Sequence, residues 1–156
     1  GPLVMKGYKD MPEQTAEAFA GGWLHTGDVG RLDEDGFLYI VDRTKDMIVT
    51  GGFNVFPREV EDVLSTHEAV GQVVVVGVPD EQWGEAVKAV IVPKPGIEGS
   101  DELTAELQAL VKDKKGSVQS PKSIDFVAAI PLTAVGKPDK KTVKAQYWED
   151  SKRGVG

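Results

Sequence analysis

Three segments of the sequence combine glycine with charged or short polar side chains, a pattern typical of ligand-binding loops. The first is Thr26-Gly27-Asp28. An aspartate on a tight glycine turn can accept two hydrogen bonds from a vicinal diol, which is the geometry of a ribose. The same tripeptide fits an aspartate that only bonds its own turn, and for so short a motif this structural alternative is favoured.

The second segment runs from residue 42 to residue 55 and joins a charged cluster to a Gly-Gly loop. Arg43 and Lys45 could contact phosphate or ribose, while Gly51 and Gly52 would let a thin ligand pass close to the backbone. The alternative is a solvated linker followed by a hairpin, and composition alone favours it, because runs of charge are usually solvated faces.

The third segment is Pro131-Leu132-Thr133-Ala134-Val135-Gly136-Lys137. A lysine on a glycine-containing loop can reach outward, and its ammonium is a compact charge suited to carboxylate or phosphate oxygens. An exposed loop lysine without a role is the competing interpretation. On the residues of this segment alone, the lysine without a role is the commoner explanation.

The elements that must position these segments differ between the two parts of the chain. Before residue 42, short apolar runs at Leu3–Met5, Trp23–Thr26 and Gly36–Val41 predict short strands. Pro12–Phe19 is typical of a short helix, and Asp33–Gly36 of a hairpin turn. So few short strands cannot form a barrel by themselves, so we expect them to be the edge of a larger domain.

From residue 42 onward, strand and helix signals of full length alternate. They predict an α+β unit of about three strands with helices packed on them. Pro57 opens a helix through Leu64, since proline fits the first helical turn and the apolar residues share one face. The remaining expected elements are strands Val70–Val78, Ala86–Val92 and Ile124–Ala129, a helix capped by Ser100, and a helix over Asp139–Trp148.

Composition excludes several classes of function. The chain has 156 residues, 25 acidic and 18 basic, for a formal charge of -7. This acidic balance argues against nucleic acid as a partner. The absence of cysteine and the presence of only two histidines argue against a metal site of the zinc type. No apolar run approaches a membrane span and no secretory signal is visible, so we expect a cytoplasmic protein and leave peripheral membrane contact open.

Taken in order, the three segments resemble a known family. The motifs G-W-x-x-T-G-D, D-R-x-K-D-x-I-x-x-x-G-x-N-V-x-P-x-E-V-E and P-x-T-x-x-G-K are similar to the C-terminal part of the adenylate-forming (AMP-binding) enzymes, specifically the fatty acyl-CoA synthetases. The resemblance implies that residues 1–42 are a trailing β segment of a large N-terminal adenylation domain. It implies that residues 43–156 are the mobile C-terminal domain.

The resemblance also implies an activity and residue roles. These ligases join a carboxylic acid to AMP from ATP and Mg²⁺, release pyrophosphate, and transfer the acyl group to CoA. Asp28 matches the aspartate that holds the ribose hydroxyls, and Arg43 an arginine that touches ribose or phosphate. Lys45 matches the hinge of the mobile domain. Lys137 matches the catalytic lysine that bridges the substrate carboxylate and the α-phosphate.

Gly51, Gly52 and Phe53 match the loop that lines the pantetheine tunnel.

One residue and one segment depart from the family pattern. Val49 stands where luciferases carry a second lysine, and residues 114–119 lack the usual tyrosine-lysine-x-proline segment. The phosphate loop, the magnesium ligands and the acyl pocket belong to the large N-terminal domain. We therefore expect the chain alone to be inactive.

Three hypotheses remain open on the sequence. The leading one is a fragment of an acyl-CoA synthetase for a medium- to long-chain fatty acid, with ATP, CoA and its own N-terminal domain as partners. The second is that the isolated chain is a non-catalytic binding module. The third keeps the chemistry of the first half-reaction but transfers the acyl group to a carrier protein.

Overall fold

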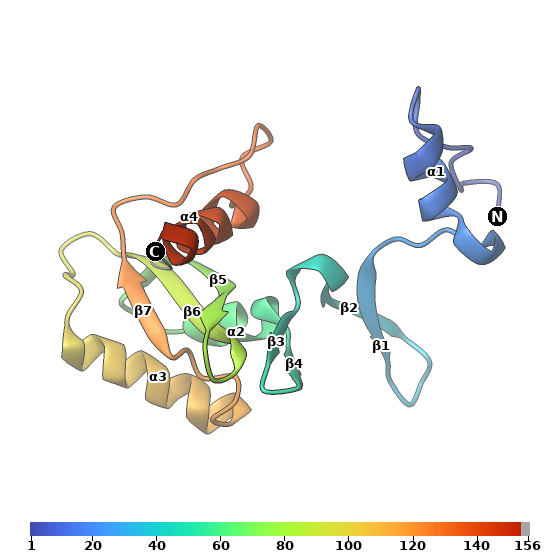
Figure 1. The fold of residues 1–156 in the computed structure, drawn as a ribbon. Coiled ribbons are helices and arrows are strands. Elements are labelled where there is room, and N and C mark those ends of the chain that lie inside the picture. Colours follow the sequence, from blue (N-terminus) through green and yellow to red (C-terminus); the bar gives the residue numbers. More distant parts are fainter. Residues whose placement is uncertain (154–156) are drawn as a thin grey trace. The chain divides into compact units, whose positions relative to one another are not determined.

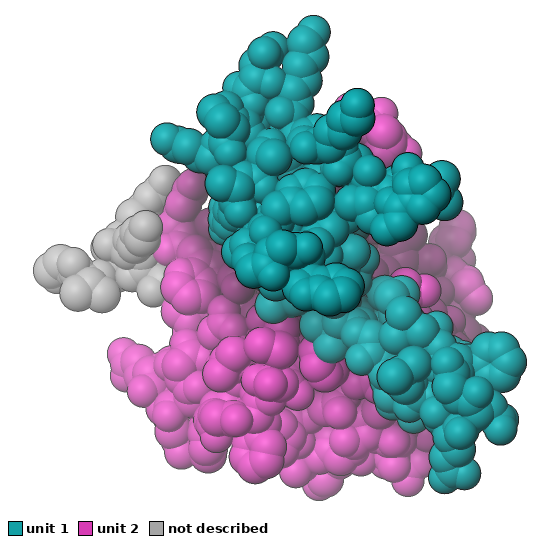
Figure 2. Space-filling view, turned by 90° about the vertical axis from the view of Figure 1, so that its right-hand side faces the viewer, with its two compact units in different colours: residues 1–45 teal, residues 46–156 magenta. Residues whose placement is uncertain are grey.

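The computed structural model describes the backbone of residues 1–153 and the side chains of residues 1–149. The chain forms two compact units, Gly1–Lys45 and Asp46–Gly156, which Figure 2 colours separately. The division falls three residues after the boundary at 42 that the sequence predicts, and the assignment of the two parts to separate domains stays a prediction. No helix in residues 1–153 has the length and the apolar character needed to cross a bilayer.

The first unit holds a short helix and a two-stranded hairpin. Helix α1 covers Pro12–Ala18, which confirms the short helix predicted over Pro12–Phe19, and a 3-10 turn follows at Ala20–Gly22. Strands β1 (Asp28–Leu32) and β2 (Leu38–Arg43) pair antiparallel. The predicted turn between them is confirmed, since Asp33 Oδ1 accepts hydrogen bonds from the backbone N–H groups of Asp35 and Phe37 at 3.1 and 2.8 Å.

Two of the predicted short strands are wrong. Leu3–Met5 and Trp23–Thr26 are irregular, and the strand of this region begins at Asp28. A strand requires a partner for its ladder, and within residues 1–45 only β1 and β2 provide one for each other. Leu3 and Trp23 accordingly remain exposed.

The second unit is built on a five-stranded sheet with β6 at its centre (Figure 1). Strand β6 (Gly84–Pro93) pairs antiparallel with β5 (Val70–Asp80) along its length and parallel with β7 (Ser123–Phe126). A small hairpin of β3 (Ile48–Thr50) and β4 (Phe53–Val55) joins the sheet through the pair Thr50 and Gly84. The α+β class is confirmed, with this hairpin added to the three expected strands.

Helices cover both faces of the sheet, as Figure 1 shows. Helices α2 (Pro57–Leu64) and α3 (Asp101–Lys115) pack on one face, and α4 (Lys140–Arg153) packs on the other. The side chains of β5 alternate between the two cores, since Val75 belongs to the α2–α3 side and Val74 and Val76 to the α4 side. The sheet thus packs against two helices on one face and one helix on the other.

Helix boundaries follow the capping signals in the sequence. Ser100 Oγ accepts a hydrogen bond of 3.2 Å from the N–H of Leu103 at the start of α3, and Gly116 ends that helix with a φ of 87°. The apolar stripe predicted for this helix is confirmed, because Leu107 and Val111 are fully buried.

Candidate functional site

The two glycines of the second motif form the tight loop of the β3–β4 hairpin. Thr50 pairs with Phe53, which leaves Gly51 and Gly52 as the two loop residues, with φ values of 56° and 83°. Two successive residues of positive φ are the requirement of a type I′ turn, whose twist matches that of the strands. Phe53 follows the turn with 61% of its surface exposed. The hairpin therefore has two loop residues without side chains, followed directly by one exposed aromatic ring.

A neighbouring turn fixes this hairpin in place. Gly51 N–H donates a hydrogen bond of 2.9 Å to the carbonyl of Trp83. A Cβ added at Gly51 would lie 2.6 Å from Cε3 of the Trp83 ring, whereas one added at Gly52 would meet open space. Asp80 Oδ1 in turn accepts hydrogen bonds from the N–H groups of Gln82 and Trp83. Gly51 is thus required both for its φ and for the room that the indole occupies.

Lys137 lies on a second tight loop of the same unit. The Thr133 carbonyl accepts from the N–H of Gly136 at 2.9 Å, and Thr133 N–H donates to the Lys137 carbonyl at 2.7 Å. Gly136 has a φ of 76°, and a bridge between Leu132 and Pro138 closes the loop. This is a type I turn ended by a glycine bulge. The Lys137 backbone is therefore held firmly.

The Lys137 side chain is exposed, and no carboxylate within residues 1–149 pairs with its ammonium. Asp139 then caps the start of α4, because its carboxylate accepts hydrogen bonds from the hydroxyl and the N–H of Thr142 at 2.8 and 3.1 Å. These two hydrogen bonds hold the pKa of the Asp139 carboxyl below its ordinary value, and the bond from the Thr142 hydroxyl contributes most. The loop thus presents the exposed ammonium of Lys137 just before the capped N-terminus of α4.

The structure does not bring Lys137 and the glycine hairpin together. Figure 1 shows the tip of β3–β4 and the loop before α4 at opposite ends of the second unit. Both belong to one compact body, so one site could meet them only in turn.

Asp28 and Arg43 meet in the first unit. They face each other in the register of β1 and β2, and Arg43 Nε lies 3.1 Å from Asp28 Oδ1. Gly27 adopts a φ of 74°, and the Thr26 hydroxyl accepts a hydrogen bond of 3.1 Å from Asp28 N–H. The side-chain hydrogen bond that closes this turn is therefore made by Thr26 and not by Asp28. The carboxylate of Asp28 can accordingly still accept hydrogen bonds from a ligand. The structure brings together the two residues predicted to bind nucleotide.

Lys45 lies in the short 3-10 turn Thr44–Asp46, with its side chain exposed, and it is the last residue of the first compact unit. A residue at this junction can absorb a change in backbone angles without disturbing a packed core. Its hinge role stays a prediction, as do the ligand contacts assigned to the other site residues.

Sequence reasoning overlooked three residues that build the site. Trp83 supports the glycine turn, and Glu61 and Glu85 hold lysines of α4 at 2.9 and 2.8 Å. The only signal for them was their position: Glu61 is the last residue of the second motif, and Trp83 and Glu85 flank Gly84 in a segment without periodicity. Among the described residues, no group of three His, Cys, Asp or Glu side chains could hold a metal ion.

Comparisons with known proteins fit this geometry. The model of the family described as AMP-binding enzyme C-terminal domain matches residues 59–137. The chain is 60% identical to the medium/long-chain-fatty-acid–CoA ligase FadD8 of Mycobacterium tuberculosis, over 100% of this chain and 28% of that protein. It is 40% identical to the fatty acid–[acyl-carrier-protein] ligase ScoC of Streptomyces coeruleorubidus, over 99% of this chain and 29% of that protein.

A solved structure shows the same fold. The amide bond synthetase McbA from Marinactinospora thermotolerans is 44% identical, with a TM-score of 0.84 over 95% of this chain and 29% of that one. The chain thus spans less than a third of the length of each of these proteins.

Proposed function

Because this chain belongs to the family of AMP-binding enzymes through their C-terminal domain, we propose that it is the C-terminal part of an ATP-dependent acyl-CoA synthetase. The complete enzyme activates a carboxylic acid as acyl-AMP and then forms the CoA thioester. The observation that carries the proposal is the placement of two different functional loops, the Lys137 loop and the glycine hairpin, at opposite ends of one compact unit.

Lys137 serves the first half-reaction. An oxygen of the substrate carboxylate attacks the α-phosphorus of ATP, and pyrophosphate leaves. Two anions must approach each other in this step, and a positioned ammonium offsets their repulsion as charge builds in the transition state. The hydrogen-bonded turn at Thr133 and Gly136 supports this role, because it holds the backbone of the lysine without occupying its ammonium.

The glycine hairpin serves the second half-reaction, in which the CoA thiol attacks the acyl carbonyl and AMP leaves. The pantetheine arm is thin, and the missing side chain at Gly52, where a Cβ would meet open space, leaves room for it beside Phe53. Rotation of the second unit about Lys45 replaces the Lys137 loop by the glycine hairpin at the acyl-AMP site. A single site can therefore carry out the two half-reactions one after the other.

The nucleotide is held in part by the first unit. Asp28 accepts hydrogen bonds from the ribose hydroxyls, and Arg43, paired with it at 3.1 Å, orients that carboxylate and contacts the nucleotide. We place the magnesium ligands and the acyl pocket in the part of the enzyme outside this chain. Mg²⁺ bound there would neutralise charge on the phosphates.

The proposed substrate is a medium- to long-chain fatty acid, with FadD8 as the supporting relative. The similarity to ScoC supports a second candidate, in which the acyl group goes to a carrier-protein arm instead of CoA. Both candidates share the first half-reaction and the role of Lys137. We propose a cytoplasmic enzyme in either case.

The two half-reactions, measured separately in the full-length enzyme, test the proposal. Lys137→Ala is expected to lower pyrophosphate release by about 100-fold or more, because it removes charge stabilisation. Thioester formation from supplied acyl-AMP should remain within about threefold. Lys141→Ala, an exposed lysine of α4, is the matched control. Unchanged pyrophosphate release in the Lys137 variant would contradict the proposal.

A further inference from the structure

Helix α4 is held by two carboxylates that come from other elements. Lys140 Nζ lies 2.9 Å from Glu61 Oε1, and Lys144 Nζ lies 2.8 Å from Glu85 Oε1. Each glutamate side chain is only 16% exposed. Ion pairs on a mobile surface contribute little, but a carboxylate so largely withdrawn from water keeps a fixed geometry and depends on its partner.

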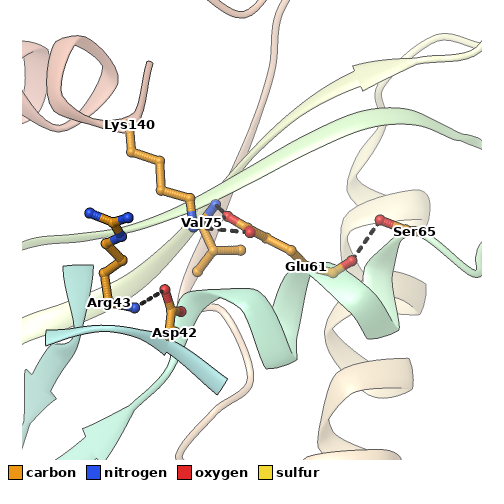
Figure 3. A network of polar contacts seen from close by, with 6 residues as sticks. All are labelled: Asp42, Arg43, Glu61, Ser65, Val75 and Lys140. Carbon is orange, nitrogen blue, oxygen red and sulfur yellow. Dashed lines mark hydrogen bonds and ion pairs between the residues drawn. The ribbon is translucent and has the colours of Figure 1, made fainter. Parts of the chain in front are cut away.

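The Glu61 pair anchors the end of the Lys137 loop. Lys140 opens α4, three residues after Lys137. Glu61 projects from α2, and its Oε1 also accepts a hydrogen bond of 2.8 Å from Val75 N–H on β5. Figure 3 shows the Lys140 ammonium and Val75 N–H converging on this one carboxylate. Glu61 therefore ties the start of α4 to the sheet and fixes the base from which Lys137 extends.

The Glu85 pair anchors the glycine hairpin. Glu85 Oε2 accepts a hydrogen bond of 3.0 Å from Val49 N–H, two residues before the Gly-Gly turn. Val49 lies opposite Asn54 in a pair that does not bond across the hairpin, so its N–H points away from β4 and needs this acceptor. The other oxygen of Glu85 takes Lys144. One carboxylate therefore joins β3 to α4.

The neighbouring strand makes room for Glu85. A Cβ added at Gly77 would lie 2.9 Å from the Glu85 carboxyl carbon, so a side chain there would displace the carboxylate. Trp148 Nε1 donates a hydrogen bond of 3.0 Å to the Gly77 carbonyl. Residues from β5, β6 and α4 thus all converge to place this single charge beside β3.

We infer that Glu61 and Glu85 are positioning residues with divided tasks, Glu61 for acyl-AMP formation through the Lys137 loop and Glu85 for thioester formation through the glycine hairpin. The inference rests on the proposed function. Neither carboxylate contacts substrate; each acts through a backbone N–H and a lysine. Division is expected because the two loops lie at opposite ends of the unit, and misplacement of about 1 Å can cost about 100-fold in rate.

Glutamine variants of the full-length enzyme test the division. Gln keeps an oxygen for the backbone N–H but removes the charge that holds the lysine. Glu85→Gln is expected to lower thioester formation from supplied acyl-AMP by about 10-fold or more and to leave pyrophosphate release within about twofold. Glu61→Gln is expected to show the reverse. Each variant is the control for the other, and Glu102→Gln controls for loss of an exposed carboxylate.

Lysine variants of the same two pairs separate positioning from folding. Lys144→Arg keeps the cation, and its thioester step should fall by less than about threefold. If a glutamine variant does not fold, Lys140→Met and Lys144→Met remove the other partner of each pair and should show the same division.

The outcomes distinguish this inference from the proposed function. Equal losses in both half-reactions, or no loss in either, would overturn the inference while leaving the proposed function intact. A wild-type enzyme that performs neither half-reaction would overturn the proposed function and this inference with it.

Discussion

At the scale of single residues, the site depends on backbone conformations that only glycine adopts without strain. Gly51, Gly52 and Gly136 all have positive φ values, between 56° and 83°, and each lies in a loop assigned to chemistry. The motif spacing predicted these positions. It could not predict that the Trp83 ring fills the space beside Gly51, because that contact joins residues 32 positions apart.

The two loop glycines should therefore differ in their tolerance of a methyl group. Gly51→Ala meets both the φ penalty and the indole, so we expect it to destabilise the 156-residue chain by about 2–3 kcal/mol, against about 1 kcal/mol for Gly52→Ala. Urea unfolding of the two variants measures the difference. Gly96→Ala, with a φ of 84° and open space where the added Cβ would lie, is the control for the φ penalty alone. Equal losses at positions 51 and 52 would show that the Trp83 contact is not restrictive.

At the scale of elements, segments with a periodic, proline or turn signal were predictable, among them the short helix α1 and the turn between β1 and β2, whereas the three-residue strands β3 and β4 were not. Helix α2 starts and ends at the predicted residues, because proline opens it and its apolar side chains repeat with the helical period. Strands β3 and β4 have three residues each, too few for a period to show. Their existence depends on pairing with each other and with Gly84, which is tertiary information.

The interior face of α3 gives a test at this scale. Leu107 is fully buried against the core, while Leu110, next on the predicted stripe, is only partly buried. Leu107→Ala is expected to lower the free energy of unfolding of the chain by about 2–5 kcal/mol, because it removes contacts and leaves a cavity. Leu110→Ala should cost clearly less. Chemical denaturation of both variants decides the matter, and a larger loss at Leu110 would contradict the assigned face.

At the scale of the whole molecule, the two units differ in self-sufficiency. The fully buried apolar side chains all lie in the second unit, beginning at Ile48, although the structure describes every residue of 1–45. The first unit instead exposes large apolar side chains, among them Leu3, Trp23 and Phe37. The sequence indicated this, since its short strands were too few to form a barrel by themselves. The apolar exposure agrees with our proposal that these residues pack against a larger domain.

Separate expression of the two units tests this difference. Residues 46–156 are expected to unfold in one cooperative transition, because they contain both cores. A peptide of residues 1–45 should show no such transition, since it buries too little apolar surface to offset its chain entropy. Thermal unfolding followed by circular dichroism measures both. A cooperative transition in the 1–45 peptide would contradict the assignment of that segment to a larger domain.

The central claim is that one mobile unit brings first the Lys137 loop and then the glycine hairpin to a single acyl-AMP site. A change at the hinge tests this claim most directly. Both half-reactions should be measured in the full-length enzyme carrying Lys45→Pro, with Lys45→Ala as the control for loss of the side chain. Proline fixes φ and restricts the preceding residue, so the 3-10 turn at Thr44–Asp46 loses its freedom to rotate. We expect thioester formation to fall by about 10-fold or more while pyrophosphate release stays within about threefold. Equal losses in both half-reactions, or none in either, would contradict the account.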